Sequence, residues 1–519
     1  MQTIIKRLPI AKTEIKELIE GNFCYVDKTK FIKDLLDDGH GYYFLSRPRR
    51  FGKSLLIDTI RAAFEAEKEI FNGLYIENNW DWSIKYPVIT ISFGAGTVDT
   101  NDQLEIRLNE LLNRNIDNNK IEIKNVSIPG RFEELIKKLF DKFNLPVVIL
   151  IDEYDKPILD NITNENANKI KEGLSSFYSV LKDASKYLKF VFLTGVSKFS
   201  KTNIFSKLNN ITDISLVPKY ADICGYTQTD LETTFADYLY NVDLEKVKNW
   251  YDGYNFLGSN LYNPYDVLLF LWEKRYRCFW FETGTPTFLL ELIKKRNYYV
   301  PNLERIQISE FEMGEFDINN IKLEILLYQT GYLTIEKLEE INENYIYTLK
   351  IPNKEVRKGL NEYLLTAFYA SGVNAYERTN VSLILSRALN QHNLDDLKLA
   401  FTTLFAGIPN NWYTNNNIAQ YEGFYCSLFY AFFAALGVEI KSEDTTNKGR
   451  IDFTIITQTA IFIFEIKMKH INKKALAQIK ERQYHQKYLS EKKDIYLIGL
   501  EFDETDKNIS TFEYEKVIV

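Results

Sequence analysis

The sequence predicts an α/β protein built from more than one domain, and three observations carry this prediction. Strand-like apolar runs alternate with helical patterns over roughly the first 220 residues, which is typical of a doubly wound parallel sheet. The last hundred or so residues follow a different order of elements, αβββαβ, with the second helix expected at about 474–489 and the last strand at 495–498. A chain of 519 residues is also too long for a single hydrophobic core.

A short apolar strand at residues 42–46 leads into a basic loop and then an apolar helix that begins near Ser54. Gly52 allows the backbone to approach a phosphate, the amides at the helix N-terminus favour an anion, and Lys53 supplies a positive charge. The Ser54 hydroxyl can take a Mg²⁺ coordination position. These residues predict a P-loop, although Arg47 stands where glycine is usual. The alternative is a basic loop that caps a helix.

A second buried strand, at residues 147–151, ends in two carboxylates, Asp152 and Glu153. Five apolar residues in a row suit a parallel strand that is covered on both faces, and sites in such sheets lie at the carboxyl ends of the strands. This is a Walker B pattern, in which Asp152 would hold Mg²⁺ through a water opposite Ser54 and Glu153 would activate the attacking water. The alternative for an acid at a strand end is a helix N-cap.

A further strand, at residues 190–193, runs into Thr194 and Ser197. One of these two hydroxyls would stand where P-loop ATPases place a polar residue near the γ-phosphate; the alternative is a hydroxyl that only satisfies the strand end. The residues predicted to bind the nucleotide are Arg50, Phe51, Gly52, Lys53, Ser54, Leu55, Asp152 and Thr194.

The last hundred residues carry a second set of candidate catalytic residues. Asp452 lies in a predicted strand at 450–456, and Glu465-Ile466-Lys467 lies in the next one. Strand alternation places Glu465 and Lys467 on one face. Two carboxylates from neighbouring strands can bind Mg²⁺, with Mn²⁺ as an alternative, and the metal activates water for attack at phosphorus. Lys467 would position that water or stabilise the developing charge.

The two motifs resemble a bacterial family of AAA-ATPase-like proteins that end in a PD-(D/E)XK nuclease superfamily domain. The segment 47–55 resembles the P-loop of this family, residues 25–29 resemble its opening segment, and 250–256, 263–268 and 279–286 resemble its lid. In the C-terminal region, Glu422 matches the acid of the family's early helix, and Gln478 matches a residue of the helix that follows the E-x-K strand. Tyr484 and Tyr488 match aromatic residues there.

The resemblance implies an ATPase that is coupled to, or gates, a metal-dependent DNase. The expected domains are a P-loop domain at 1–220, a helical lid at 221–295, a helical or winged-helix-like middle at 296–405 and a restriction-endonuclease-like domain at 406–519. Two further hypotheses stay open. The protein could be an ATP-driven switch whose nuclease-like domain binds nucleic acid without cutting, or a nucleotide-loaded scaffold that oligomerises and recruits partners. For the middle region we favour a coupling role over nucleic-acid binding.

The amino-acid composition limits which binding partners and which cellular compartment are expected for the protein. A net charge of −7 argues against a wholesale nucleic-acid coat but permits a local basic face. Such a face is expected at residues 465–493, where nine basic residues stand against three acidic ones; the alternative is a solvated helix. Four widely separated cysteines suggest neither a zinc site nor a disulfide framework, which fits the cytoplasm. No membrane span is expected, and homo-oligomerisation is an open alternative.

Overall fold

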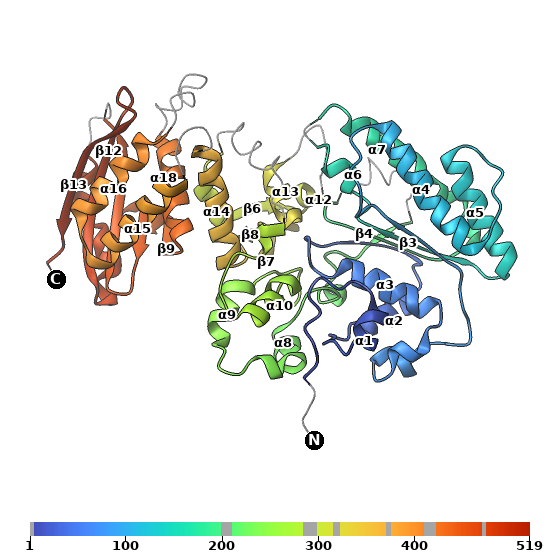
Figure 1. Ribbon diagram of the computed structural model, residues 1–519. Helices are drawn as coiled ribbons and strands as arrows, with labels where there is room; N and C mark the ends of the chain where they lie inside the picture. Colours follow the sequence, from blue (N-terminus) through green and yellow to red (C-terminus); the bar gives the residue numbers. More distant parts are fainter. Residues whose placement is uncertain are drawn as a thin grey trace. The chain divides into compact units, whose positions relative to one another are not determined.

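The computed structural model describes residues 5–162, 164–198, 210–283, 298–314, 322–369, 375–408, 422–469 and 474–518. The chain forms two compact units (Figure 1). The N-terminal unit contains Met1–Gly284 and Ile306–Asn353, and the C-terminal unit contains Thr285–Arg305 and Lys354–Val519. Each unit is therefore assembled from two separate stretches of chain. The four domain boundaries drawn from the sequence stay a prediction.

The N-terminal unit is organised around a five-stranded sheet in which every pair of neighbouring strands is parallel. Its order is β2-β3-β4-β1-β5, so the predicted P-loop strand and Walker B strand flank the strand that carries Thr194. The strands are β1 (Tyr42–Ser46), β2 (Val88–Ser92), β3 (Val147–Asp152), β4 (Leu188–Gly195) and β5 (Thr212–Asp213). The predicted parallel α/β class is confirmed. All of β3 is buried, as its unbroken apolar run requires.

Helices cover both faces of this sheet. Helix α3 contacts β2, β3 and β4, while α4 and α5 contact β2 and β3 and pack with α7. Figure 1 shows α4, α5 and α7 on the opposite side of the sheet from α1 and α3. The helices of this layer are α1 (Ile15–Glu20), α2 (Thr29–Asp38), α3 (Lys53–Phe64), α4 (Asn101–Asn119), α5 (Ile128–Phe143), α6 (Lys156–Leu159) and α7 (Ala167–Asp183).

A helical segment and a small β-module complete the N-terminal unit. The helices α8 (Gln228–Thr234), α9 (Leu244–Tyr251) and α10 (Pro264–Glu273) share an apolar core with Cys24 and Val26 from the start of the chain. The module has the order β6 (Ile306–Ser309), α12 (Glu310–Gly314), α13 (Leu323–Thr330), β7 (Thr334–Ile341) and β8 (Asn344–Lys350), and its strands form an antiparallel sheet β6-β8-β7. Strand β6 was not predicted from the sequence.

The β-module is tied to the P-loop and to the end of β4. Gly331 (φ +94°) lies against Pro48, and a Cβ atom at this position would stand 2.7 Å from the Pro48 Cβ. The backbone amide of Lys198, just after β4, donates to the side chain of Gln329 at 3.1 Å. The close approach at Gly331 therefore needs a residue without a side chain.

The C-terminal unit contains a five-stranded sheet of order β13-β12-β11-β10-β9, in which only β11 and β12 run parallel. The predicted αβββαβ order is present as α18 (Glu422–Leu436), β9 (Glu439–Thr446), β10 (Gly449–Ile456), β11 (Ala460–Met468), α19 (Ala475–Arg482) and β12 (Asp494–Asp503). Three further helices, α14 (Lys354–Tyr369), α15 (Ala375–Gln391) and α16 (Leu394–Ala406), and strand β13 (Asn508–Lys516) belong to the same unit.

Two sequence-based expectations for this unit are corrected. The helix expected at 474–489 ends at Arg482, because Gln483 adopts a left-handed φ of 50° and the chain continues as a 3₁₀ helix at Tyr484–Glu491. The sheet also extends beyond the predicted last strand, since β13 pairs with β12 along most of its length.

A short segment that precedes the β-module also belongs to the C-terminal unit. The 3₁₀ helix Val300–Glu304 packs on α18 and β9. The carboxylate of Glu304 pairs with Arg357 at 2.8 Å and accepts a hydrogen bond from Tyr430. The backbone amide of Val300 donates to Ser427 at 3.3 Å. Among the described helices, none is long and apolar enough to cross a membrane.

Candidate functional site

The P-loop connects β1 to α3 and is already shaped around a cation. Gly52 caps the N-terminus of α3 with φ +92°, a conformation that favours glycine. The ammonium of the buried Lys53 donates to the carbonyl oxygens of Arg47 and Pro48, at 2.9 and 2.8 Å. Burial lowers the pKa of Lys53, because the charged form loses its hydration. An anionic ligand in the loop would restore a counter-charge to this group.

Asp152, at the end of β3, joins the P-loop to β4. One carboxylate oxygen accepts a hydrogen bond from the Ser54 hydroxyl and the other accepts one from Thr194, both at 2.6 Å. The structure therefore brings together three residues that were predicted from three different strand ends. Ser54 and Asp152 are adjacent, as a shared Mg²⁺ between them requires.

Glu153 follows directly and turns away from the sheet. Its φ of 52° is in the left-handed region, which is uncommon for a residue with a side chain. Burial, and then the charge of Asp152, raise the pKa of Glu153. Its carboxylate lies close to Gly94, where an added Cβ would stand 3.4 Å from Oε2. A carboxyl whose pKa is shifted upward in this way suits proton transfer from water.

The second hydroxyl considered from the sequence has a different partner. Ser197 donates through both its amide and its hydroxyl to the buried carboxylate of Asp155, each at 2.5 Å. The amide of Val196 donates to the same carboxylate. Asp155 therefore fixes the chain at the end of β4, whereas Thr194 is the hydroxyl that contacts Asp152.

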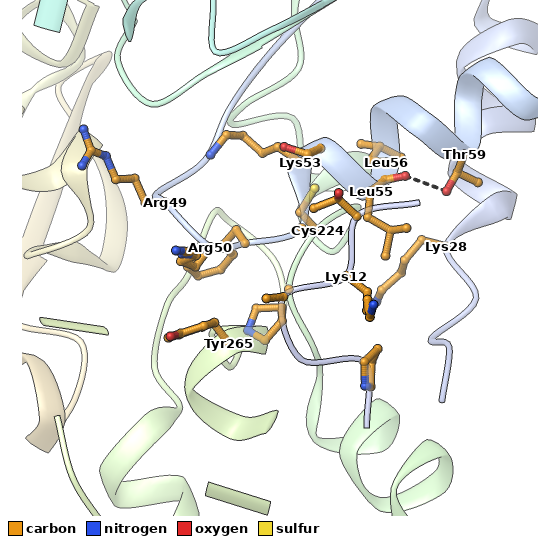
Figure 2. A pocket seen from close by; sticks show the side chains of 18 of the residues that line it. Lys12, Lys28, Arg49, Arg50, Lys53, Leu55, Leu56, Thr59, Cys224 and Tyr265 are labelled. Atoms are coloured by element: carbon orange, nitrogen blue, oxygen red, sulfur yellow. Dashed lines mark hydrogen bonds between the residues drawn. The ribbon is translucent and has the colours of Figure 1, made fainter. Parts of the chain in front are cut away.

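A cavity of about 600 Å³ opens over the P-loop, which is large enough for a nucleotide. The predicted residues that line it are Arg50, Phe51, Gly52, Lys53, Ser54, Leu55 and Glu153. Other parts of its wall come from the start of the chain and from the helical segment. Tyr25 and Lys28 belong to the segment 25–29, which was expected to cross the front of the nucleotide site, and Tyr265 belongs to the lid segment 263–268. No role was predicted for Lys12, Cys224 and Tyr226, which also line the cavity. Figure 2 shows Lys12 and Lys28 on the opposite side of this space from Arg49.

The residues before Gly52 contribute in different ways. The guanidinium of Arg50 lies over the ring of Tyr265, 4.8 Å from its centre (Figure 2). The Phe51 ring is buried against Tyr254 and Phe256 in edge-on contacts. The side chain of Phe51 thus anchors the loop.

Arg47 explains how the loop forms without its usual first glycine. Its guanidinium is 1% exposed and donates to the carbonyl oxygens of Ser215, Tyr220 and Ala221 at 2.8–3.1 Å. It also lies 4.0 Å from the centre of the Phe256 ring. Arg47 therefore holds together the segment after β5, and its side chain is not among the residues that line the cavity.

The C-terminal unit brings the second set of predicted residues together. Glu465 is 1% exposed, and its Oε1 accepts hydrogen bonds from Lys467 (3.1 Å) and Gln478. Its Oε2 is buried and has no hydrogen-bond partner among the described residues. Lys467 also lies 4.0 Å from Glu422. The carboxylate of Asp452 accepts a hydrogen bond from the amide of Ile466 at 2.7 Å, so both acids sit where β10 meets β11.

A local irregularity frees Asp452 from the sheet. The β9–β10 ladder pairs Ile451 with Asp444 and Phe453 with Ser442, and it skips the position between them. The skipped residue of β9 is Glu443, which has a φ of 47°. The register is the same on both sides of this gap, so the ladder is interrupted at one pair and neither strand carries an extra residue. Residue patterns along the two strands do not predict this interruption.

Several buried carboxyl groups lie close together in this site, and this shifts their pKa values. Burial raises the pKa of both Asp452 and Glu465, and the charge of each neighbouring carboxylate raises it further. Burial opposes the charged form of Lys467, but the carboxylates outweigh it and raise the pKa of this lysine. A divalent cation would relieve the repulsion and give the orphan oxygen of Glu465 a partner. No group of three or more His, Cys, Asp or Glu side chains arranged for a metal occurs among the described residues.

The basic face expected at 465–493 is largely neutralised. Lysines on this stretch pair with carboxylates of neighbouring strands, which the count along the sequence could not include. The pairs are Lys469–Asp503, Lys474–Glu513, Lys480–Glu515 and Lys487–Asp444. Lys467 pairs with Glu465, and Lys473 lies outside the described residues. The two matched tyrosines are both buried, and Tyr488 donates to Asp444.

Comparison with known proteins agrees with this division of the chain. Residues 9–205 match the family model of a predicted AAA-ATPase, and residues 420–512 match that of the PD-(D/E)XK nuclease superfamily. A relative from Azotobacter chroococcum mcd 1, described as an uncharacterized protein in the vnfD 5' region, is 41% identical over 516 residues, which cover 99% of each chain. The chain therefore belongs to the family of predicted AAA-ATPases that carry a C-terminal PD-(D/E)XK nuclease superfamily domain.

Proposed function

We propose that the N-terminal unit binds and hydrolyses ATP. One observation carries the proposal: Asp152 links the Ser54 hydroxyl to Thr194 beside a cavity of nucleotide size. When bound, Mg²⁺ would neutralise phosphate charge between Ser54 and Asp152. Lys53 would exchange its two loop carbonyls for phosphate oxygens. Glu153 would take a proton from the attacking water, because its raised pKa makes it a stronger base than an exposed glutamate.

Two substitutions test this proposal. Lys53→Ala is expected to abolish nucleotide binding, because the charge at the phosphates is lost. Glu153→Gln should retain binding and lose turnover by at least about a hundredfold, since the geometry survives while the proton acceptor does not. A fluorescent ATP analogue measures binding and phosphate release measures turnover, with the exposed Glu172→Gln as control. Normal turnover in Glu153→Gln would remove Glu153 from this role.

We propose further that the C-terminal unit is a metal-dependent nuclease acting on DNA. The buried orphan oxygen of Glu465, next to Asp452, supports this best, because such an atom is costly unless a ligand satisfies it. Mg²⁺ or Mn²⁺ would activate water and stabilise charge at phosphorus. In this proposal Gln478 and Lys467 orient Glu465, Lys467 also assists the developing charge, and Glu422 keeps Lys467 in place.

The metal and the cleavage are tested separately. Asp452→Ala should remove both Mn²⁺ binding, measured by calorimetry, and cleavage of labelled DNA. Lys467→Ala should lose cleavage but keep Mn²⁺. Phosphate release from ATP should persist in both variants, since the P-loop lies in the other unit. Parallel reactions with RNA, and with or without ATP, identify the substrate and the coupling. Cleavage that survives in Asp452→Ala would refute this site.

The second candidate is an ATP-driven switch or scaffold whose nuclease-like unit binds without cutting. The observation in its favour is that Lys467 already occupies one oxygen of Glu465 and that no three-ligand metal cluster exists among the described residues. A wild-type protein that binds DNA but does not cut it with either metal would select this candidate. Light scattering with and without ATP tests whether the chain forms a homo-oligomer. The four separated cysteines support a cytoplasmic setting, which fractionation of cells would test.

A further inference from the structure

Three basic side chains lie at the β9–β10 turn of the C-terminal unit and at the adjacent end of α19. Lys448 lies in the turn, Arg450 begins β10, and Arg482 ends α19. Arg482 donates to the carbonyl oxygen of Lys448 at 2.9 Å, and Lys448 donates to the side chain of Gln483. Neither cation has a carboxylate within ion-pair distance among the described residues. This differs from the paired lysines of α19.

Arg450 is held at the surface by an acid of the candidate site. Its side chain is 67% exposed and pairs with Glu443 at 2.9 Å. Glu443 is the residue of β9 that stands opposite Asp452 at the interrupted pair. The phenol of Tyr299 donates to the other oxygen of Glu443 at 3.5 Å. Arg450 is therefore oriented by residues that border the paired carboxylates.

The other two cations border the same site from the side of α19. The Tyr484 phenol lies under the turn, because a Cβ at Gly449 would stand 2.8 Å from its oxygen. Arg482 ends α19 one helical turn after Gln478, whose side chain donates to Glu465. Arg450 stands two residues before Asp452 on β10. The turn and the end of α19 thus lead to the two predicted metal ligands.

We infer that Lys448, Arg450 and Arg482 form a phosphate-binding rim that holds the backbone of a nucleic acid at the nuclease-like site. The inference rests on the proposed function of that site. Lys448 and Arg482 have no ion pair among the described residues, so they can neutralise phosphates and release counterions directly. Arg450 is paired with Glu443, and the lysines of α19 with Glu513 and Glu515, so these cations would first have to leave a carboxylate. Arg450 belongs to the rim because it is exposed and stands two residues before Asp452. Arg450 and Arg482 can also contact a phosphate with two parallel hydrogen bonds.

The test is binding of the full chain to short labelled duplex DNA, single-stranded DNA and RNA, measured by anisotropy in EDTA so that no cleavage occurs. The triple variant Lys448→Gln, Arg450→Gln, Arg482→Gln should bind duplex DNA about tenfold or more weakly at low salt. The salt dependence of log K should fall in magnitude by about 2.7, or about 0.9 for each cation. The paired-lysine control, Lys474→Gln with Lys480→Gln, should stay close to wild type. Comparison of the three nucleic acids shows which backbone the rim prefers.

The outcomes separate the rim from the function on which it rests. If wild type binds none of the nucleic acids, both the proposed function and the rim are refuted. If wild type binds and the triple variant binds with the same affinity and salt slope, only the rim is refuted. An equal loss in the paired-lysine control would also refute the rim, because it would show a diffuse charge effect. Circular dichroism and the melting temperature check that the triple variant is folded.

Discussion

Replacing Arg47 by glycine restores the usual P-loop pattern, yet we expect it to destabilise the N-terminal unit. The guanidinium satisfies three carbonyl oxygens from the segment after β5. Leaving each of them unpaired costs about 1 kcal/mol or more, and loss of the contact with Phe256 costs about another 1 kcal/mol. Relief of a buried cation, whose pKa burial lowers, offsets part of this loss. The expected net cost is about 3 kcal/mol.

Thermal unfolding followed by fluorescence measures this cost. The unfolding entropy of this unit is about 0.7 kcal/mol/K, from about 2.1 cal/mol/K per residue, so about 3 kcal/mol corresponds to a fall in Tm of roughly 4 °C. Arg47→Met keeps much of the side-chain volume and should fall less than Arg47→Gly, which adds a cavity. The exposed Arg114→Met on α4 is the matched control and should change little. A Tm for Arg47→Gly equal to that of wild type would refute the reasoning, and so would a tenfold gain in ATP affinity.

The remaining predictions concern the β-module and one buried acid. Gly331→Ala should lower the Tm and weaken ATP binding, because its Cβ would meet Pro48, whose carbonyl holds Lys53. Gly73 also has a positive φ but no neighbouring atoms at its Cβ position, so Gly73→Ala is the control. Equal effects of the two substitutions would contradict the role of the contact with Pro48. Asp252→Asn should raise the Tm at neutral pH, since burial raises the pKa of this carboxyl and one of its oxygens has no hydrogen-bond partner in the part of the chain that the structure describes. Because the pKa of Asp252 is raised in the folded state, its ionised form destabilises the protein. The rise in Tm of Asp252→Asn over wild type should therefore shrink as the pH falls toward the pKa of an unfolded aspartate. A rise in Tm that does not depend on pH would contradict this explanation.

The sequence predicted the sites that depend on motifs with a local physical basis. Gly52, Lys53 and Ser54 lie where a strand meets a helix, and Asp152 ends a strand that is apolar throughout, so their placement follows from short-range patterns. Thr194 was identified only as one of two candidates, since the choice depends on how β4 lies beside β3. The structure distinguishes the two hydroxyls by their partners.

Features that depend on contacts distant in sequence were missed. Lysines that look unpaired along α19 meet acids of β13, a strand that follows them by more than thirty residues. The role of Arg47 depends on carbonyls about 170 residues away. The interruption of the β9–β10 ladder at Glu443 and the hydrogen bond from Tyr299 to Glu443 likewise arise only when separate segments meet. Charge counts and motif patterns contain no information about such partners.

Each unit is built from two separate stretches of chain, which affects both folding during synthesis and the design of recombinant fragments. The N-terminal unit cannot complete its contacts at Pro48 and Lys198 on the ribosome until the chain has emerged past Gly331, well beyond the last strand of the main sheet. A recombinant fragment that starts at residue 354 would lack Glu304 and so leave Arg357 and Tyr430 without that partner. A fragment that ends at residue 284 would expose the loop around Pro48. Neither the proposed ATPase activity nor the proposed nuclease activity should therefore be assayed with a fragment made by truncating the chain at one position.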